Sequence, residues 1–394
     1  MAYWSRLAGD KVEWNYVVAG TCLFAAGALV RSLFIKPQAS YIYTSPRTTL
    51  LPKLSDEEVS RLPYPPDVLP GARDVDSPYG SIRAYEFGPE DGRKVLLVHG
   101  ISTPAIALLP VANALVEKGC RVLLFDLFGR GYSDNASDIK HDIRLFTTQI
   151  LLVLASSPLS WTGKDSGKFA LVGYSLGGGI ATTFTSYFPN LVDSLILFAP
   201  AGLIRPHHIS RQTRILYSDG IIPEPLLHRL VKQRLRTPIA AQPKKPDPSR
   251  KVDATEAVGA EVNLESNSKA PLSKDHPHAS VEAAIYHQLD HHPGFVPAFM
   301  SSIRYGPVRD QHDRWRVVGE RLSQQNKENG TQKKVLIVLG STDPIIIKQE
   351  VQEDATETLS GNVEFTVLDA AHDVAVVKGP EIAAAIVDFW ERTD

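Results

Sequence analysis

A serine lies between two glycines in the segment Gly173-Tyr174-Ser175-Leu176-Gly177, after an apolar run and before a stretch of helical length. In that context the G-x-S-x-G pattern predicts a sharp strand-to-helix turn with Ser175 at its tip. Glycines are expected at 173 and 177 because a Cβ there would clash with the neighbouring strand and helix. The N-terminus of the following helix favours negative charge at the same place. The segment therefore predicts a serine nucleophile.

A serine hydroxyl reacts poorly unless a base takes its proton and an acid holds that base. His372 follows the last apolar run of the chain, and Asp343 follows the preceding one. The order serine, aspartate, histidine is the order expected for this kind of turn. Asp369 and Asp373 are competing acids, but residues so close to His372 in sequence are badly placed to orient its ring. We predict a catalytic triad of Ser175, Asp343 and His372.

The stabilisation of a tetrahedral oxyanion needs two backbone amides near the nucleophile. His99-Gly100-Ile101 follows an apolar run, and a turn there can direct the N–H of Ile101 toward Ser175. Together with the N–H of Leu176 it would form an oxyanion hole. We interpret His99 as a structural residue rather than a general base.

Asp126 begins a second loop rich in glycine, 126–133, after another apolar run. This composition predicts a tight, hydrogen-bonded loop near the pocket, in which Asp126 is structural rather than catalytic. The histidines His287, His291 and His292 could resemble metal ligands, but no carboxylate or cysteine accompanies them at suitable spacing. We therefore predict neither a metal site nor a cofactor.

The elements that must position these residues follow from the alternation of short apolar runs and helical stretches. The runs lie at 94–98, 121–125, 169–172, 195–198, 335–339 and 363–368, and the helical stretches at 109–118, 139–155, 177–188 and 380–392. Apolar runs of this length predict strands buried on both faces. The pattern predicts an α/β fold, a mostly parallel sheet covered by helices, with an antiparallel edge hairpin of 73–77 and 82–87.

The alternation stops between residues 200 and 333, although a crossover needs only about a dozen residues. We predict that 201–332 is a helical cap inserted after the sixth strand. Its polar middle, about 238–280, should be disordered. The core that carries the triad would then consist of 73–200 and 333–394.

The N-terminal region differs in composition from the rest of the chain. After a tail of residues 1–15, residues 16–35 are mostly apolar and long enough for a membrane anchor if Arg31 reaches the interface. We expect a single anchoring helix, with organelle and orientation undetermined. A signal peptide and a buried or amphipathic helix are the alternatives. Residues 36–72 are rich in proline and predict a linker, with a short helix at 55–61.

Composition excludes some classes of protein. The formal net charge of −2 argues against an electrostatic nucleic-acid binder. Two cysteines exclude a disulfide scaffold and a cysteine-rich zinc module. The oligomeric state is not indicated.

The motifs together resemble the α/β-hydrolase superfamily, over about 73–394 without the insertion. The matching positions are His99-Gly100, Asp126-x-x-Gly129-x-Gly131-x-Ser133, Gly173-Tyr174-Ser175-Leu176-Gly177-Gly178, Gly340-x-x-Asp343 and His372. Within it the chain is similar to capped, membrane-anchored serine hydrolases of the monoacylglycerol lipase type. The resemblance implies the acid, base and oxyanion roles at the positions named above. Serine at the turn departs from epoxide hydrolases and haloalkane dehalogenases, which have aspartate there.

We therefore expect a serine hydrolase that cleaves carboxylic esters through an acyl-enzyme. The anchor and the cap favour lipophilic substrates such as monoacylglycerols. A carbon–carbon bond hydrolase, a thioesterase or a tailoring hydrolase of secondary metabolism could use the same triad. The remaining alternative is a non-catalytic binding protein that keeps the fold.

Overall fold

The computed structural model describes residues 14–34, 41–163, 167–205, 208, 222–236, 271–273 and 276–393. The chain divides into two compact units, Met1–Tyr41 and Ile42–Asp394. The second unit contains all of the residues predicted to do chemistry.

The larger unit is built on an eight-stranded sheet with the order β10-β9-β8-β7-β4-β5-β3-β2. Its strands are β2 (Ala72–Val75), β3 (Ile82–Phe87), β4 (Arg93–Val98), β5 (Cys120–Phe125), β7 (Phe169–Tyr174), β8 (Val192–Phe198), β9 (Val335–Gly340) and β10 (Val363–Leu368). The six strands from β10 to β5 pair in parallel, whereas β3 and β2 pair antiparallel at the edge. This confirms the predicted sheet and its edge hairpin.

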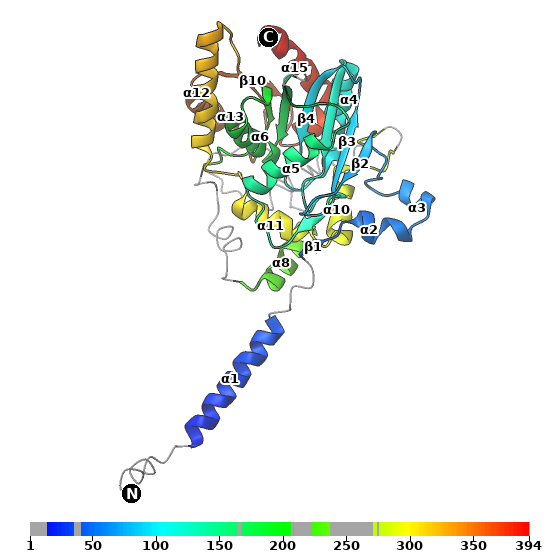
Figure 1. The fold of residues 1–394 in the computed structure, drawn as a ribbon, viewed down its shortest axis with the longest axis vertical. Coiled ribbons are helices and arrows are strands. Elements are labelled where there is room, and N and C mark those ends of the chain that lie inside the picture. The colour runs from blue at the N-terminus through cyan, green and yellow to red at the C-terminus, as the bar shows by residue number, and fades with distance from the viewer. Residues whose placement is uncertain are drawn as a thin grey trace, which may run out of the picture. The chain divides into compact units, whose positions relative to one another are not determined.

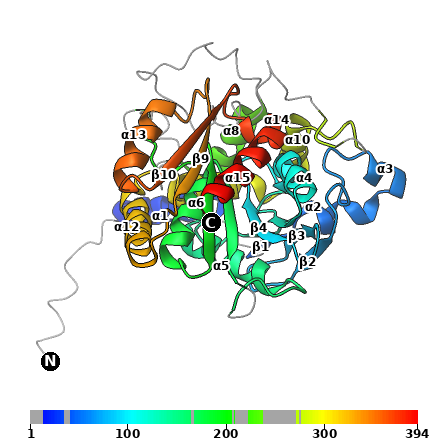
Figure 2. The same ribbon diagram turned by 90° about the horizontal axis from the view of Figure 1, so that it is seen from above.

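Helices cover the sheet in two groups (Figure 2). One group consists of α4 (Leu109–Glu117), which follows the 3-10 turn η2 (Ala105–Leu108), and of α14 (Val374–Val377) and α15 (Gly379–Thr393). The other contains α5 (Ile143–Ala155), α6 (Leu176–Tyr187) and α12 (His312–Asn329), with α13 (Lys348–Thr358) packed against α12. The central strands β7 and β9 are buried along their whole length. The predicted α/β fold is therefore confirmed.

The long connection from β8 to β9 begins after the sixth strand of the large sheet, as predicted. It contains α8 (Glu224–Arg236), α10 (Val281–His291), α11 (Phe295–Tyr305) and α12. The first three gather at one end of the sheet, and α12 packs against α6 (Figure 1). The predicted disordered segment, 238–280, lies outside the described residues except for 271–273 and 276–280.

From Ile42 onward, the proline-rich segment before the large sheet is part of the larger unit. Its strand β1 (Ile42–Tyr43) pairs with β6 (Asn135–Ala136), and α2 (Pro46–Thr49) and the 3-10 turn η1 (Leu51–Lys53) follow. The predicted short helix is α3 (Asp56–Ser60), which begins with a capping box between Ser55 and Glu58.

The N-terminal unit contains α1 (Trp14–Phe34). In the described part of the chain, none of the helices combines the length and the apolar character needed to cross a membrane. The prediction that residues 16–35 form a membrane-spanning helix is therefore wrong for the described helix α1. The uncharged part of α1, from Trp14 to Val30, rises about 25 Å at ~1.5 Å per residue, which is shorter than a hydrocarbon core of ~30 Å.

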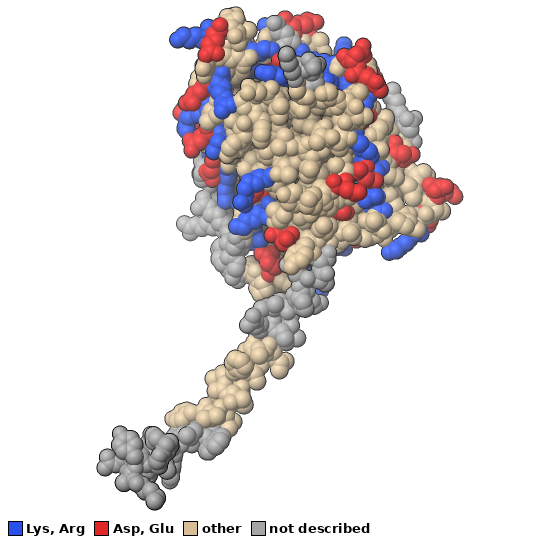
Figure 3. Space-filling model, viewed as in Figure 1, with Lys and Arg blue, Asp and Glu red and all other residues tan. Residues whose placement is uncertain are grey.

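Charged residues are mixed in sign on the surface of the larger unit. Figure 3 shows acidic and basic side chains interspersed around the rim of one face, with uncharged residues across its centre. This face therefore has no broad patch of a single charge.

Candidate active site

The turn between β7 and α6 holds Ser175 in a strained backbone conformation, with φ 53° and ψ −117°. Positive φ is rare for residues other than glycine and persists only where the surroundings enforce it. Here the N–H of Ser175 donates to Phe198 O at 3.0 Å, and the N–H of Ala201 donates to Ser175 O at 2.9 Å. The end of β8 therefore holds the turn on both sides of the serine.

The two glycines of the turn are required for the steric reason predicted from the sequence. A Cβ on Gly173 would lie 2.2 Å from the carbonyl oxygen of Gly177. A Cβ on Gly177 would lie 2.1 Å from the carbonyl oxygen of Val98. Both distances are far below van der Waals contact, so a side chain at either position would push α6 away from the sheet.

The structure brings Ser175, Asp343 and His372 together. His372 Nε2 lies 3.0 Å from Ser175 Oγ, and His372 Nδ1 lies 2.8 Å from Asp343 Oδ2. All three side chains are buried, with relative exposures of 7%, 2% and 0% for Ser175, Asp343 and His372. With Nδ1–H donating to the carboxylate, Nε2 is left to accept the serine proton.

The carboxylate of Asp343 is itself held in place by backbone amides. Its Oδ1 accepts hydrogen bonds from the N–H groups of Ile345 at 2.8 Å and Ile346 at 2.9 Å, so Oδ2 faces the imidazole. The competing Asp369 is exposed and lies 3.4 Å from Ser341 Oγ. Of the carboxylates considered from the sequence, Asp343 is thus the one fixed against Nδ1.

The loop that carries His372 is close to the one that carries Asp343 because β9 and β10 pair in parallel, with Leu368 opposite Gly340. A Cβ on Gly340 would lie 2.2 Å from Ala371 O, so the two loops are in direct contact. The Tyr174 hydroxyl donates to His372 O at 2.9 Å. The residue before the serine therefore also fixes the backbone of the histidine.

The two amides predicted to form the oxyanion hole come from the ends of neighbouring elements. Leu176 is the first residue of α6, and the first amides of a helix have no partner within the helix. Ile101 lies in the loop that follows β4. The preceding peptide oxygen, Gly100 O, lies 2.8 Å from His99 Nδ1, which orients the peptide that carries the Ile101 N–H.

His99 is buried and hydrogen-bonds to two backbone groups. Its Nε2 accepts from the N–H of Leu127 at 2.8 Å, so Nδ1 must carry the proton that is donated to Gly100 O. Burial lowers the pKa of His99 to about 3. The ring is therefore neutral and held in one tautomer, and it connects the Ile101 loop to the Asp126 loop.

The carboxylate of Asp126 links its own loop to two other segments of the chain. Its carboxylate accepts from the N–H groups of Ala105 at 2.8 Å and Tyr132 at 2.9 Å and from the Tyr64 hydroxyl at 3.1 Å. Burial raises the pKa of Asp126 to about 6, although these hydrogen bonds act in the opposite direction. Gly131 has φ +52°, and a Cβ there would lie 2.1 Å from Asp126 Oδ2.

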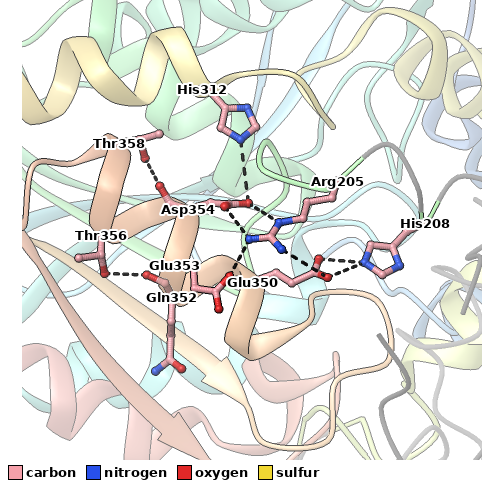
Figure 4. A network of polar contacts seen from close by, with 9 residues as sticks. All are labelled: Arg205, His208, His312, Glu350, Gln352, Glu353, Asp354, Thr356 and Thr358. Atoms are coloured by element: carbon pink, nitrogen blue, oxygen red, sulfur yellow. Dashed lines mark hydrogen bonds and ion pairs between the residues drawn. The ribbon is translucent and has the colours of Figure 1, made fainter. Parts of the chain in front are cut away.

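The helix that follows the Asp343 loop, α13, is tied to the beginning of the β8–β9 connection by a network that sequence reasoning did not predict (Figure 4). Arg205 donates from Nε to Asp354 Oδ2 at 3.0 Å and from Nη2 to Asp354 Oδ1 at 2.8 Å. The same Nη2 lies 2.8 Å from Glu353 Oε2, and His208 Nε2 lies 2.8 Å from Glu350 Oε2. The contacts fix α13 and so the strand-to-helix loop that precedes it.

Two buried polar residues beside the Ile101 loop, Arg130 and Gln288, were also not predicted from the sequence.

No cluster of three or more histidine, cysteine or acidic side chains is arranged to hold a metal ion among the residues that the structure describes. His292, one of the histidines weighed as a ligand, lies with its Nε2 2.9 Å from Ser133 O.

Comparison with known proteins supports the fold described above. The family model for the alpha/beta hydrolase fold matches residues 94–218. A serine hydrolase-like protein of Danio rerio is 27% identical over 128 residues, which are 32% of this chain and 37% of that protein. The putative carbamate hydrolase RutD of Variovorax paradoxus is 32% identical over 114 residues, which are 29% of this chain and 40% of that protein.

Among solved structures, carboxylesterase CesB of Bacillus subtilis superposes with a TM-score of 0.53 and 16% identity, covering 81% of this chain and 90% of that one. At this identity the similarity concerns the fold alone. The chain spans less than half of the length of these two sequence relatives, 37% and 40%. The chain has the α/β-hydrolase fold and is similar to serine hydrolase-like proteins.

Proposed function

We propose that the protein is a serine hydrolase that cleaves carboxylic esters through an acyl-enzyme on Ser175. The observation that carries this proposal is the pair of distances at His372, 3.0 Å from Nε2 to Ser175 Oγ and 2.8 Å from Nδ1 to Asp343 Oδ2. A nucleophile, a base and an orienting acid in hydrogen-bonding contact are the arrangement that acyl transfer requires.

The reaction follows from the positions of these groups. Ser175 Oγ attacks the ester carbonyl carbon while His372 Nε2 accepts the hydroxyl proton, and Asp343 stabilises the imidazolium. The amides of Ile101 and Leu176 hold the negative oxygen of the tetrahedral intermediate. His372 then returns the proton to the leaving alcohol, which departs as the acyl-enzyme forms. Water, deprotonated by His372, attacks the acyl-enzyme and releases the acid and free Ser175.

The substrate class that we propose is a lipophilic ester of the monoacylglycerol kind. The proposal rests on the apolar surroundings of the loops that carry the site. Helix α11, which contacts the Arg130 side chain through Ser302, adds Phe295, Phe299 and Met300 to the hydrophobic core there. Apolar side chains with a few polar groups are typical of pockets for lipophilic ligands.

A fluorophosphonate probe tests the proposed nucleophile. The purified chain is expected to be labelled at Ser175, and the Ser175→Ala variant is expected to show no labelling while keeping the same melting temperature within a few degrees. Absence of labelling in folded wild-type protein would overturn the proposal.

A substrate panel tests the class of ester. We expect turnover of p-nitrophenyl acyl esters and of monoacylglycerols, with kcat/KM rising with acyl length. The panel includes a thioester, a carbon–carbon bond substrate and a carbamate, the last because one relative is named a putative carbamate hydrolase. Preferential turnover of one of these three would replace the ester assignment while keeping the triad.

A further inference from the structure

Two successive carbonyl groups next to the predicted oxyanion amide are each held by a buried side chain. Ile101 O accepts a hydrogen bond from Arg130 Nε at 3.0 Å. Ser102 O accepts one from Gln288 Nε2 at 3.0 Å. The loop after β4 is therefore fixed at two adjacent residues by groups that come from outside it.

Arg130, in the Asp126 loop, connects the Ile101 loop to α11. Its guanidinium is fully buried and also donates from Nη1 to Phe128 O at 3.0 Å and from Nη2 to Ser302 Oγ at 2.9 Å. Ser302 belongs to α11, is itself fully buried and donates to Ala298 O at 2.8 Å. A single side chain thus connects the backbone of Ile101 with the helices between β8 and β9.

Gln288 makes the corresponding connection from α10. Its Oε1 accepts from the N–H of Gly131 at 2.7 Å, and its Nε2 donates to Ser102 O at 3.0 Å. The side chain is 2% exposed, and both of its ends are satisfied, so the orientation of the amide is determined. From its position in α10, the Gln288 side chain therefore bridges the Asp126 loop and the Ile101 loop.

Buried polar groups strongly resist the loss of a partner, because water cannot replace the missing hydrogen bond. Arg130 and Gln288 therefore add two fixed points to the Ile101 loop, beside the one that His99 provides at Gly100 O. Catalysis by an oxyanion hole is sensitive to such placement, since the donors must meet the oxygen at hydrogen-bonding distance in the transition state.

We propose that Arg130 and Gln288 are positioning residues that, through their contacts with α11 and from α10, align the Ile101 amide for the chemical step. This inference rests on the proposed function, because it assumes that the Ile101 amide stabilises the oxyanion.

The test compares three variants: Gln288→Met, Ser302→Ala and the matched control Ser301→Ala. Gln288→Met keeps the size of the side chain but removes both hydrogen bonds. Ser302→Ala removes the contact between α11 and Arg130. Ser301, on the same helix, accepts a hydrogen bond from the N–H of His141 at 3.0 Å, so its substitution removes a bond between α11 and the core that does not reach the Ile101 loop.

We expect Gln288→Met to lower kcat about 10- to 100-fold and Ser302→Ala to lower it about 3- to 10-fold, with KM changed less than about twofold. Ser301→Ala should keep the wild-type kcat within about twofold. Each kcat is calculated per Ser175 site that a fluorophosphonate titrates. A lower fraction of folded protein is then not mistaken for a lower kcat.

The outcomes separate this inference from the proposed function. If the wild-type protein is neither labelled nor active, the proposed function fails. If it is active and both Gln288→Met and Ser302→Ala match Ser301→Ala in kcat per site, the positioning role fails while the hydrolase assignment stands. If Gln288→Met does not fold, Ser302→Ala alone decides. A change in KM without a change in kcat would also overturn the inference, because it indicates an effect on substrate binding.

Discussion

Gly177, in the first turn of α6, lies so close to Val98, the last residue of β4, that no Cβ fits between them. The added atom would be 2.1 Å from Val98 O and 2.7 Å from His99 O. The contact joins the start of the helix that contributes the Leu176 amide to the start of the loop that contributes the Ile101 amide. The relative position of the two predicted oxyanion donors therefore depends on residue 177 being glycine, which has no Cβ.

Replacement of Gly177 with alanine should separate these two elements. We expect Gly177→Ala to lower kcat at least about 100-fold, comparable to the loss of one oxyanion donor, and to lower the melting temperature. Steady-state kinetics and thermal denaturation measure the two effects. Gly27→Ala is the control, because a Cβ there meets no atom within 4 Å, and it should leave both quantities unchanged.

Replacement of Asp343 with asparagine should remove the charge that orients and stabilises His372. We expect Asp343→Asn to lower kcat about 10³- to 10⁴-fold with little change in KM, because the interaction matters chiefly in the transition state. Hydrolysis of a p-nitrophenyl ester measures this. Asp369→Asn, which alters the exposed carboxylate of the neighbouring loop, should keep wild-type activity; a similar loss in both variants would contradict the assignment of the acid.

The convergence of Ser175, Asp343 and His372 could be predicted because each follows a strand of one parallel sheet. Parallel strands end at the same edge, so residues that lie 29 and 197 positions from His372 in the chain meet there. The steric requirement for Gly173 and Gly177 was predictable for the same reason, since it depends only on the local turn.

The contacts of Gln288 and Arg205 could not be predicted, because they depend on the path of the connection between β8 and β9. Periodicity indicates that helices occur there, but it does not say where they pack. Helix α13 was also missed: in Lys348–Thr358 only Val351, Ala355 and Thr358 are buried, which is too weak an apolar pattern to stand out. The prediction of a membrane-spanning helix was wrong because the uncharged part of α1, although suitable in composition, is too short.

Replacement of Arg205 should destabilise the larger unit moderately. The guanidinium binds Asp354 through two nitrogens and also Glu353, but it is about a third exposed, so solvent screens part of the interaction. We expect Arg205→Met to lower the melting temperature by about 2–4 °C, corresponding to ~1 kcal/mol. Calorimetry measures this, and Arg61→Met, which removes an ion pair at a fully exposed site, should produce no shift.

Stability should fall on the acid side of neutrality because several buried histidines are neutral in the folded chain. Burial lowers the pKa of His99 and His141 to about 3 and of His287 and His292 to about 4. The unfolded chain takes up protons on these residues near pH 6.5, whereas the folded chain does not. We expect the melting temperature to be highest above pH 6.5 and to decrease as the pH falls toward 4.

Asp126 should act in the opposite direction over part of this range. Its pKa is raised to about 6 by burial, so the folded chain binds a proton there more readily than the unfolded chain between about pH 4 and 6. Its contribution is present at low pH and is lost as the pH rises through 6. Asp126→Asn should therefore make the acid-side decrease in melting temperature steeper. An unchanged slope would show that this carboxyl keeps an ordinary pKa.

The backbone angles of Ser175 place the nucleophile for catalysis but lower the stability of the folded chain. A non-glycine residue at φ 53° and ψ −117° costs on the order of 1–3 kcal/mol, and a glycine there would relax that cost. A Ser175→Gly chain should thus be inert yet melt at a higher temperature than the native one. Selection for stability alone would replace the serine at this position. A serine that is retained there would therefore indicate selection for catalytic activity.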